Sequence, residues 1–215
     1  MKTLIVSGGY IDDPFATDWI ANNQYDLKVA ADRGMEFFYR NQITPDLIVG
    51  DYDSVSSEIL DFFKANPCVE MITLNPIKDD TDTEYAIRKV IERGATSITL
   101  LGATGSRLDH VLGNIELLQI GLENQVTIEI IDRSNRIRMI NQGISIRKNL
   151  QFGNYVSLIP YTKEVSGLTL EGFRYSLHDF TMKKGSTLGI SNEIEGEVAK
   201  IHLNEGILLI IESRD

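Results

Sequence analysis

The strongest constraint on the fold is a change in hydrophobic pattern near Asp132. Before that point, short runs rich in β-branched residues alternate with segments such as Ile87, Val90 and Ile91, whose spacing suits one helix face. The expected strands are residues 3–6, 27–31, 47–50, 71–74, 97–101 and 126–131. Runs as uniformly apolar as Leu47 to Val49 suit strands covered by helices on both faces. This part of the chain is therefore predicted to be an α/β domain with a doubly wound parallel sheet.

Beyond Asp132 the helical spacing disappears, and glycines separate short strand-like runs. The expected strands are residues 137–140, 144–146, 155–159, 168–170, 187–190, 197–203 and 207–212. This pattern is typical of an all-β sandwich or barrel, and we take the sandwich as the prediction. We therefore expect two domains, residues 1–135 and 136–215.

Acidic residues follow the ends of the predicted strands in the first domain. They are Asp32, Asp51, Asp53, Asp79, Asp80, Asp82 and Asp109. In open α/β sheets, ligands bind beyond the carboxyl ends of the strands, and carboxylates gathered there repel one another unless a cation neutralises them. The sequence therefore predicts a site for a hard cation and an anionic ligand.

The segment from Pro45 to Ser54 carries the most specific part of this pattern. Residues two apart on an extended strand point the same way, so Asp51 and Asp53 can present both carboxylates to one Mg²⁺. The alternative is that Asp53 or Ser54 only caps the following helix. Hydrolases of the phosphoaspartate type also use Asp-x-Asp, but Tyr52 and Ser54 depart from their usual pattern. Asp32, similarly, is either a ligand or a helix cap.

The segment from Lys78 to Glu84 superficially resembles a calcium loop. It fails that test, because the sixth position is Glu84 rather than glycine and the twelfth is Val90 rather than glutamate. Thr81 and Glu84 have capping-box spacing, which predicts a helix start. Asp79 and Asp82 exceed what a cap requires, so we expect them at a ligand or metal. Lys78 is placed to meet a phosphate as a point charge.

A glycine-rich segment, Gly102 to His110, follows the fifth predicted strand and opens a helix expected over residues 108–122. Backbone amides, the helix N-terminus and the Arg107 guanidinium together favour an anion. The residues expected to bind the phosphates or lie near them are Gly102, Thr104, Gly105, Arg107, His110 and Asn114. Asp109 also has a structural alternative, as a residue that favours the helix dipole.

Two further segments carry weaker signals. Gly8 and Gly9 follow the first strand and suit either a phosphate or a tight turn. Ser191 and Asn192 offer small polar groups to an uncharged heteroaromatic ring, although they also read as a turn.

The composition limits the possible partners and location. Asp and Glu number 31 against 21 Lys and Arg, so the net charge is -10, which disfavours nucleic acid and anionic membranes. No apolar segment approaches the ~20 residues of a membrane helix, and we expect a cytoplasmic protein. The single cysteine, Cys68, is expected to be a small buried side chain.

Taken in order, five of these segments strongly resemble the bacterial thiamine pyrophosphokinases. They are Ala31 to Gly34, Pro45 to Ser54, Lys78 to Glu84, Gly102 to His110, and Gly189 to Glu193. The likeness covers nearly the whole chain, and it rests on the order of the five segments rather than on any single motif.

The resemblance implies a Mg²⁺-dependent transferase in which the thiamine hydroxyl attacks the β-phosphorus of ATP and expels AMP. It implies a cation at Asp51, Asp53 and Asp82, with Asp32 and Asp79 nearby. It also implies that Arg107, Lys78 and the loop from Gly102 to Gly105 hold phosphates, that Asp109 is among the catalytic acids, and that Ser191 and Asn192 hold the thiamine pyrimidine. A homodimer with thiamine sites between its subunits is implied as well.

Two residues depart from the family pattern, and two other functions stay open. Ser106 stands where the family often has glycine, and Trp19 is too early in the chain to be a thiamine platform, which leaves Tyr175 as a candidate. The alternatives are another Mg²⁺-dependent phosphoryl or pyrophosphoryl enzyme with a different alcohol acceptor, and a sensor that binds thiamine diphosphate or a nucleotide without turnover. The complete acidic set argues against the sensor.

Overall fold

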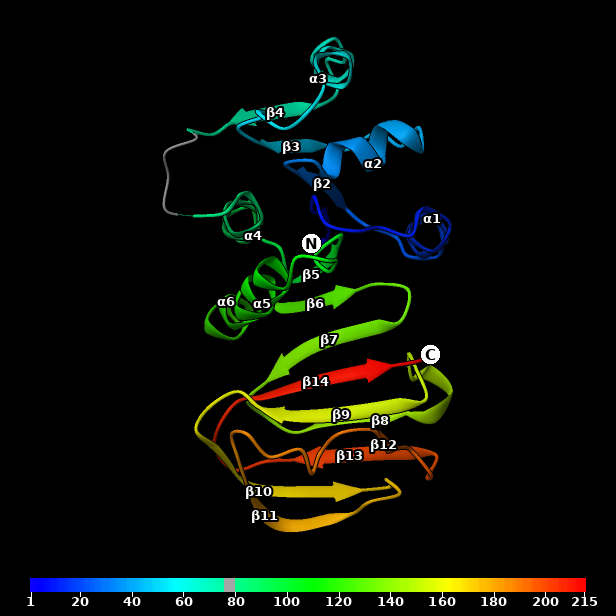
Figure 1. The fold of residues 1–215 in the computed structure, drawn as a ribbon, viewed down its shortest axis with the longest axis vertical. Helices are drawn as coiled ribbons and strands as arrows, with labels where there is room; N and C mark the ends of the chain where they lie inside the picture. The colour runs from blue at the N-terminus through cyan, green and yellow to red at the C-terminus, as the bar shows by residue number, and fades with distance from the viewer. Residues whose placement is uncertain (76–79) are drawn as a thin grey trace. The chain divides into compact units, whose positions relative to one another are not determined.

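The computed structural model describes residues 1–75 and 80–215 (Figure 1). The chain forms two compact units, Met1–Arg133 and Ser134–Asp215, where the sequence analysis placed the division after residue 135. The first unit is an α/β structure with a parallel sheet and the second is rich in β-strands, which confirms the predicted fold class.

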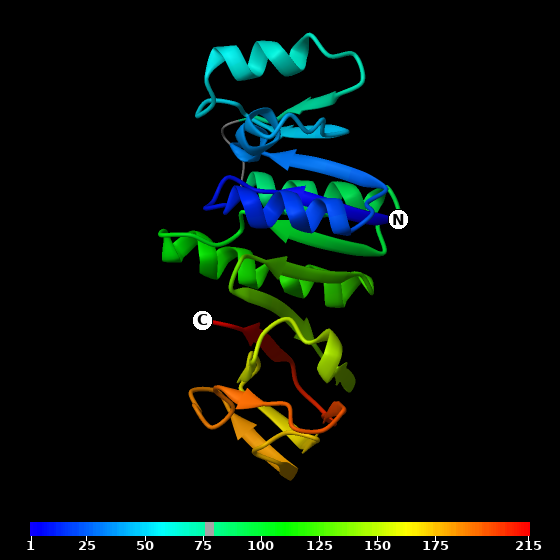
Figure 2. The same cartoon turned by 90° about the vertical axis from the view of Figure 1, so that its right-hand side faces the viewer.

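The sheet of the first unit is parallel throughout. Its strands are β1 (Lys2–Val6), β2 (Leu27–Ala31), β3 (Leu47–Gly50), β4 (Glu70–Thr73), β5 (Ser97–Leu101) and β6 (Thr127–Ile131). They lie in the order β6-β5-β1-β2-β3-β4, and the arrowheads of the visible strands point the same way in Figure 2. The strand order reverses between β1 and β5, which is the position where such sheets bind ligands beyond the carboxyl ends of the strands.

Helices cover both faces of this sheet. They are α1 (Asp13–Asn22), α2 (Gly34–Arg40), α3 (Ser57–Lys64), α4 (Asp82–Glu92), α5 (Leu108–Glu116) and α6 (Leu118–Asn124). Figure 1 shows α1 and α2 on one face and α4, α5 and α6 on the other. All four residues of β3 are buried, as its uninterrupted apolar run requires.

The helix boundaries correct three expectations. Ser56, rather than Asp53 or Ser54, caps α3, by accepting a hydrogen bond from the Ile59 amide. Arg33 occupies the N-cap position of α2, so Asp32 is not its cap. The helix expected over residues 108–122 divides at Leu117, because the Ile120 amide donates to the Leu117 carbonyl only three residues back and tightens the turn there.

The second unit is a sandwich of two sheets. Its strands are β7 (Asn135–Ile140), β8 (Ile144–Arg147), β9 (Tyr155–Pro160), β10 (Glu164–Glu171), β11 (Leu177–Lys183), β12 (Asn192–Glu193), β13 (Val198–His202) and β14 (Leu208–Ser213), with a short 3₁₀ helix over Lys148–Leu150. The strand orders are β12-β9-β14-β7 and β11-β10-β13-β8. Leu158 and Ile210 from one sheet share a buried core with Leu168 and Ile201 from the other.

One strand of the second unit was misplaced by sequence reasoning. Residues 187–190 form a turn, closed by a hydrogen bond from the Ile190 amide to the Thr187 carbonyl, rather than the expected strand. The strand in this region is β11, whose side chains are mostly exposed. A strand with little apolar alternation lacks the signal on which the prediction depended.

Two further features bear on the sequence expectations. Cys68 is exposed rather than buried, because it lies in the turn that follows α3. Among the described residues, no helix is long and apolar enough to span a membrane.

Candidate active site

Three aspartates from separate segments meet at the carboxyl ends of the strands. One carboxylate oxygen from each of Asp32, Asp51 and Asp82 lies within 4.8 Å of the other two. Asp32 follows β2, Asp51 follows β3, and Asp82 is the first residue of α4. Each is half-buried. We call these three residues the acidic group.

Asp32 is held in place by its backbone and by a neighbouring hydroxyl. Its backbone is left-handed, with φ 51°, and its amide donates to the Val49 carbonyl at 2.8 Å. The Ser54 hydroxyl donates to Asp32 Oδ1 at 2.9 Å. A Cβ on Gly8 would lie 3.4 Å from Asp32 Oδ2, which is ordinary contact, and a tight 3.0 Å from Arg33 Cβ, so residue 8 packs against this segment. Tertiary contacts thus aim Asp32 into the acidic group.

The backbone at Tyr52 departs from the extended strand on which the pairing of Asp51 with Asp53 was based. Tyr52 has φ 63°, so the chain is no longer extended there and the alternation of side chains fails. The buried Tyr52 hydroxyl donates to the Ile72 carbonyl at 2.8 Å, and burial raises the pKa of Tyr52 to about 12. Asp53 is exposed, and its amide donates to Asp51 Oδ1 at 3.2 Å. The expectation of an extended backbone between Asp51 and Asp53 was wrong, and the carboxylates that lie together with that of Asp51 are those of Asp32 and Asp82.

Asp82 owes its position to the start of α4. Thr81 caps the helix by accepting a hydrogen bond from the Glu84 amide at 3.1 Å, as the capping spacing predicts. The hydroxyl groups of Thr83 and Ser7 share a hydrogen bond of 2.9 Å, which joins the first turn of α4 to the end of β1. The helix N-terminus therefore presents Asp82 beside the strand ends.

The loops after β1 and β5 are joined by their backbones. The amides of Ser7, Gly9 and Tyr10 donate to the carbonyls of Leu101, Gly102 and Thr104 at 2.8, 2.8 and 2.9 Å. A Cβ on Gly9 would lie 2.4 Å from the carbonyl oxygens of Gly102 and Thr104, so only glycine permits this approach. The Gly9 amide is thus engaged, which favours the structural alternative for Gly8 and Gly9 over a phosphate cradle.

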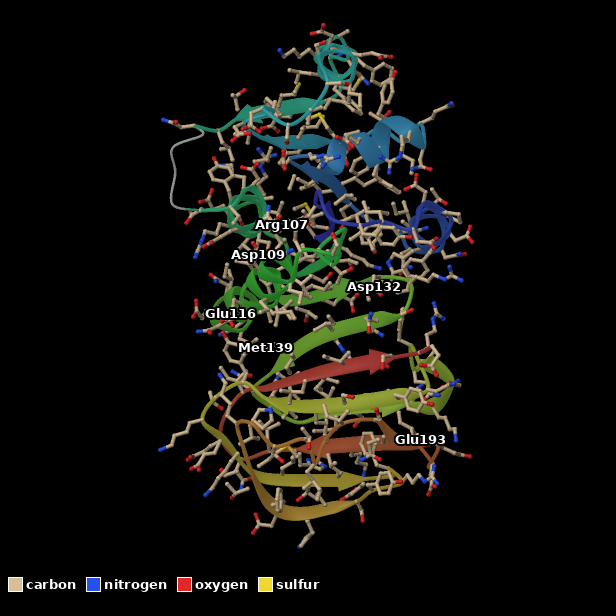
Figure 3. The ribbon with its side chains drawn as sticks, in the orientation of Figure 1. Arg107, Asp109, Glu116, Asp132, Met139 and Glu193 are labelled. Carbon is tan, nitrogen blue, oxygen red and sulfur yellow. The ribbon has the colours of Figure 1, made fainter. Side chains whose placement is uncertain are left out.

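The predicted phosphate-binding arginine is paired within its own segment. Arg107 Nη2 donates to Asp109 Oδ2 at 2.6 Å and Nε donates to Oδ1 at 3.3 Å, and Figure 3 shows both largely exposed residues at the start of α5. These hydrogen bonds lower the pKa of Asp109 and raise the pKa of Arg107. Both groups are therefore charged at neutral pH, and the guanidinium is held in a fork geometry that also suits phosphate.

The remaining predicted residues of the first unit lie around this segment. Asn114 Nδ2 donates to the Ala103 carbonyl at 2.8 Å and so fastens α5 to the glycine-rich loop. His110 is exposed on the first turn of α5. Gly102 is left-handed, with φ 67°, and Gly105 has φ 152°. Lys78 and Asp79 lie outside the described residues.

In the second unit, Ser191 and Asn192 have different environments. Ser191 is exposed, with φ 56°, and its amide donates to the Ser157 hydroxyl at 3.0 Å. The Asn192 side chain is buried and hydrogen-bonded to both backbone groups of Tyr175. Tyr175 is 61% exposed. The Asn192 side chain is therefore engaged with the protein backbone, whereas Tyr175, which the sequence named only as a candidate, presents an exposed aromatic ring.

The acidic group has the donor chemistry of a hard-cation site. Hard divalent cations take oxygen ligands, and Mg²⁺ is commonly bound through carboxylates together with substrate phosphates. Three carboxylates this close also repel one another, and a cation would remove that repulsion. Together with an arginine at a helix N-terminus, the residues present can bind a phosphate ester and a divalent cation.

Comparison with known proteins gives a consistent result. Residues 20–130 match the family model of the thiamin pyrophosphokinase catalytic domain, and residues 141–208 match that of the thiamin pyrophosphokinase vitamin B1 binding domain. The chain is 34% identical to a thiamine pyrophosphokinase of Bacillus subtilis over 218 residues, covering 100% of both sequences.

Solved structures agree. The thiamine pyrophosphokinase structure from Bacillus subtilis superposes with a TM-score of 0.90 at 32% identity, covering 100% of both chains. The Geobacillus thermodenitrificans structure gives 0.85 at 34% identity, covering 100% of this chain and 98% of the other. The yeast thiamin pyrophosphokinase, at 20% identity, gives 0.81 over 99% of this chain and 86% of the other, a likeness of fold.

Proposed function

The chain belongs to the thiamin pyrophosphokinase family, and on that premise we propose that its acidic group holds the Mg²⁺ used in the reaction. The reaction transfers the pyrophosphoryl group of ATP to the hydroxyl of thiamine and gives thiamine diphosphate and AMP. The observation that carries the cation proposal is the meeting of Asp32, Asp51 and Asp82 within 4.8 Å at the carboxyl ends of the strands.

The protein's part in such a transfer is to position the reactants and to balance charge. A Mg²⁺ held by the acidic group would supply positive charge to the phosphate oxygens. Asp32, Asp51 and Asp82 would hold this ion, and Asp53 and Asp79 remain proposed contributors from the same two segments. Because three different segments supply the carboxylates, the site depends on the whole α/β unit rather than on one motif.

Arg107 is our proposed contact for the transferred phosphates. It lies at the N-terminus of α5, where the helix dipole also favours an anion, and its fork is already ordered by Asp109. Asp109 would keep Arg107 oriented, and the guanidinium would also donate hydrogen bonds to the phosphates of bound ATP. Lys78, Gly102, Thr104, Gly105, His110 and Asn114 are proposed neighbours of the nucleotide, and no general base is assigned.

For thiamine, we propose that the second unit supplies the binding surface, with Ser191 and Tyr175 facing the ligand. Tyr175 and Ser191 are both exposed, and Asn192 joins their segments. An aromatic ring beside small polar groups suits a flat heteroaromatic ligand.

We also propose a homodimer whose thiamine sites involve both subunits, and a cytoplasmic location. Support for the dimer comes from α5, none of whose side chains is fully buried and whose Leu108 and Leu112 are 72% and 63% exposed. Two large apolar side chains on one short helix are costly to leave in water. The location rests on the composition of the sequence.

The direct test is to incubate the purified chain with thiamine, ATP and Mg²⁺, with and without EDTA, and to identify the nucleotide product by chromatography. We expect AMP and thiamine diphosphate in equal amounts, and neither in EDTA. ADP in place of AMP would indicate a simple kinase. Binding of thiamine diphosphate or ATP without any product would indicate a sensor.

A further inference from the structure

The hydrogen bond between Ser7 and Thr83 joins two segments of the first unit that are 76 residues apart in the chain. Ser7 directly follows β1 and is only 3% exposed, and Thr83, which is half-buried, lies in the first turn of α4. The two hydroxyl oxygens are 2.9 Å apart. Because one partner is buried and the other half-buried, water competes only in part for this hydrogen bond, which can therefore hold the two segments together.

Both partners lie next to the acidic group. Thr83 directly follows Asp82, and Ser7 directly precedes Gly8, whose Cβ position is 3.4 Å from Asp32 Oδ2. The bond therefore connects the segment that carries Asp82 to the strand end that packs against Asp32. Neither hydroxyl belongs to the acidic group itself.

The hydrogen bond between Ser7 and Thr83 can limit the separation of segments whose carboxylates repel one another. The three carboxylates belong to separate segments and repel one another before a cation binds. If the segments could separate freely, part of the free energy of cation binding would be spent on bringing them together again. Groups that orient metal ligands without touching the metal commonly change its affinity.

We infer that Ser7 and Thr83 are positioning residues that set the distance of Asp82 from Asp32 and thereby the affinity of the cation site. This inference rests on the proposed function, because it concerns the same cation. It assigns no contact with thiamine, ATP or the cation to either hydroxyl.

The test measures cation binding directly, by titrating the full chain with Mn²⁺ in place of Mg²⁺ and following the free ion by electron paramagnetic resonance. Thr83→Val keeps the side-chain shape and removes the hydroxyl.

We expect Thr83→Val to weaken Mn²⁺ binding by about fivefold, the effect of losing one ordinary hydrogen bond. Ser7→Ala should weaken it similarly, and the double variant should be no weaker than either single variant, because all three lack the same bond. Thr83→Ser, which keeps a hydroxyl, should bind Mn²⁺ as the unaltered chain does.

Two comparison variants separate this inference from the proposed function. Thr99→Val removes the hydroxyl of a buried threonine, which donates to Glu129 Oε1 at 3.2 Å outside the acidic group, and should leave Mn²⁺ binding unchanged. Asp51→Asn removes a proposed ligand and should abolish Mn²⁺ binding. Thermal unfolding in EDTA confirms that each variant is folded.

The outcomes are distinct. If Asp51→Asn abolishes binding while Thr83→Val and Ser7→Ala bind normally, the positioning role is overturned and the proposed cation site stands. If Asp51→Asn binds Mn²⁺ as tightly as the unaltered chain, the proposed cation site itself is overturned, and the positioning role with it. Equal weakening by Thr99→Val would show a general loss of stability and would also overturn the inference.

Discussion

The buried side-chain amide of Asn192 forms hydrogen bonds with both the backbone amide and the backbone carbonyl of Tyr175. Asn192 Oδ1 accepts a hydrogen bond from the Tyr175 amide at 3.0 Å, and Nδ2 donates to the Tyr175 carbonyl at 2.8 Å. Asn192 is 4% exposed, whereas the ring of Tyr175 projects into solvent beside Arg174. A side chain with both its donor and its acceptor engaged in this way fixes the backbone of Tyr175, next to the hydrogen bond from the Arg174 amide to the Glu193 carbonyl.

If these two hydrogen bonds hold Tyr175 in position to contact thiamine, Asn192→Ala should raise the KM for thiamine severalfold and change kcat little. The removal of two buried hydrogen bonds should also lower the free energy of unfolding by about 1–3 kcal/mol. Steady-state kinetics and urea denaturation measure the two effects. Tyr175→Ala should raise the same KM without a comparable loss of stability. Should Tyr175→Ala leave the KM for thiamine unchanged, the proposed contact between Tyr175 and thiamine is wrong.

Asp51→Asn should remove activity and leave the fold intact. The amide is close in size to the carboxylate but carries no charge, so it binds a hard cation poorly. Turnover with saturating Mg²⁺ and circular dichroism give the comparison. Asp61→Asn, an exposed acidic residue on α3 outside the acidic group, is the matched control and should keep full activity. Substantial turnover by Asp51→Asn would remove Asp51 from the cation site.

Arg107→Lys should raise the KM for ATP although the charge is kept. Lysine lacks the planar fork with which Arg107 meets Asp109 and with which we propose it meets phosphate. Arg88→Lys is a close control, since Arg88 is also an exposed arginine paired with a carboxylate, Glu84, on a neighbouring helical turn. Equal KM values for the two variants would argue against a phosphate contact at Arg107.

The pair formed by Glu70 and Arg93 should make a small part of the stability depend on pH. Two hydrogen bonds of 2.6 and 2.8 Å from Arg93 lower the pKa of Glu70 below its ordinary value of 4.5. A carboxyl whose folded pKa is lowered stabilises the fold above its unfolded pKa, and this contribution is lost as the pH falls through the folded pKa. Because the pair is exposed, Glu70→Gln should cost about 0.5 kcal/mol at pH 7.

Urea denaturation of the Glu70→Gln variant and the unaltered chain at pH 7 and near pH 3 checks this prediction. The difference in unfolding free energy should shrink at the lower pH. A difference that persists unchanged in acid would mean that Glu70 stabilises the fold by something other than its charge.

The exposed leucines of α5 provide a test of the proposed dimer. Replacing both Leu108 and Leu112 by serine should weaken self-association, because their apolar surface would no longer gain from burial. Sedimentation velocity over a range of concentrations measures the change. Leu150→Ser is the control, since Leu150 is equally exposed but lies in the 3₁₀ helix of the second unit. A monomeric unaltered chain would contradict the proposal outright.

Particular residues show where sequence reasoning succeeded and where it failed. The capping role of Thr81 could be predicted from local spacing, because the acceptor and the amide are only three residues apart. The hydrogen bond from the Glu84 amide to the Thr81 hydroxyl confirms it. The expected extended backbone between Asp51 and Asp53 was wrong, because Tyr52 is left-handed there and its hydroxyl reaches a carbonyl of β4. β11 was missed because its side chains are mostly exposed and carry little apolar alternation.

The sequence by itself determined the alternation of strands and helices in the first unit, the change to a β-rich second unit, and which segments carry acidic and glycine-rich chemistry. These properties depend on periodicity and on residues a few positions apart, which are visible in a linear chain. Only the tertiary structure decided that Asp32 joins Asp51 and Asp82, that Ser7 bonds to Thr83, and that Asn192 holds Tyr175. Each of these contacts joins residues from different segments, and their meeting depends on strand order and close packing rather than on local spacing.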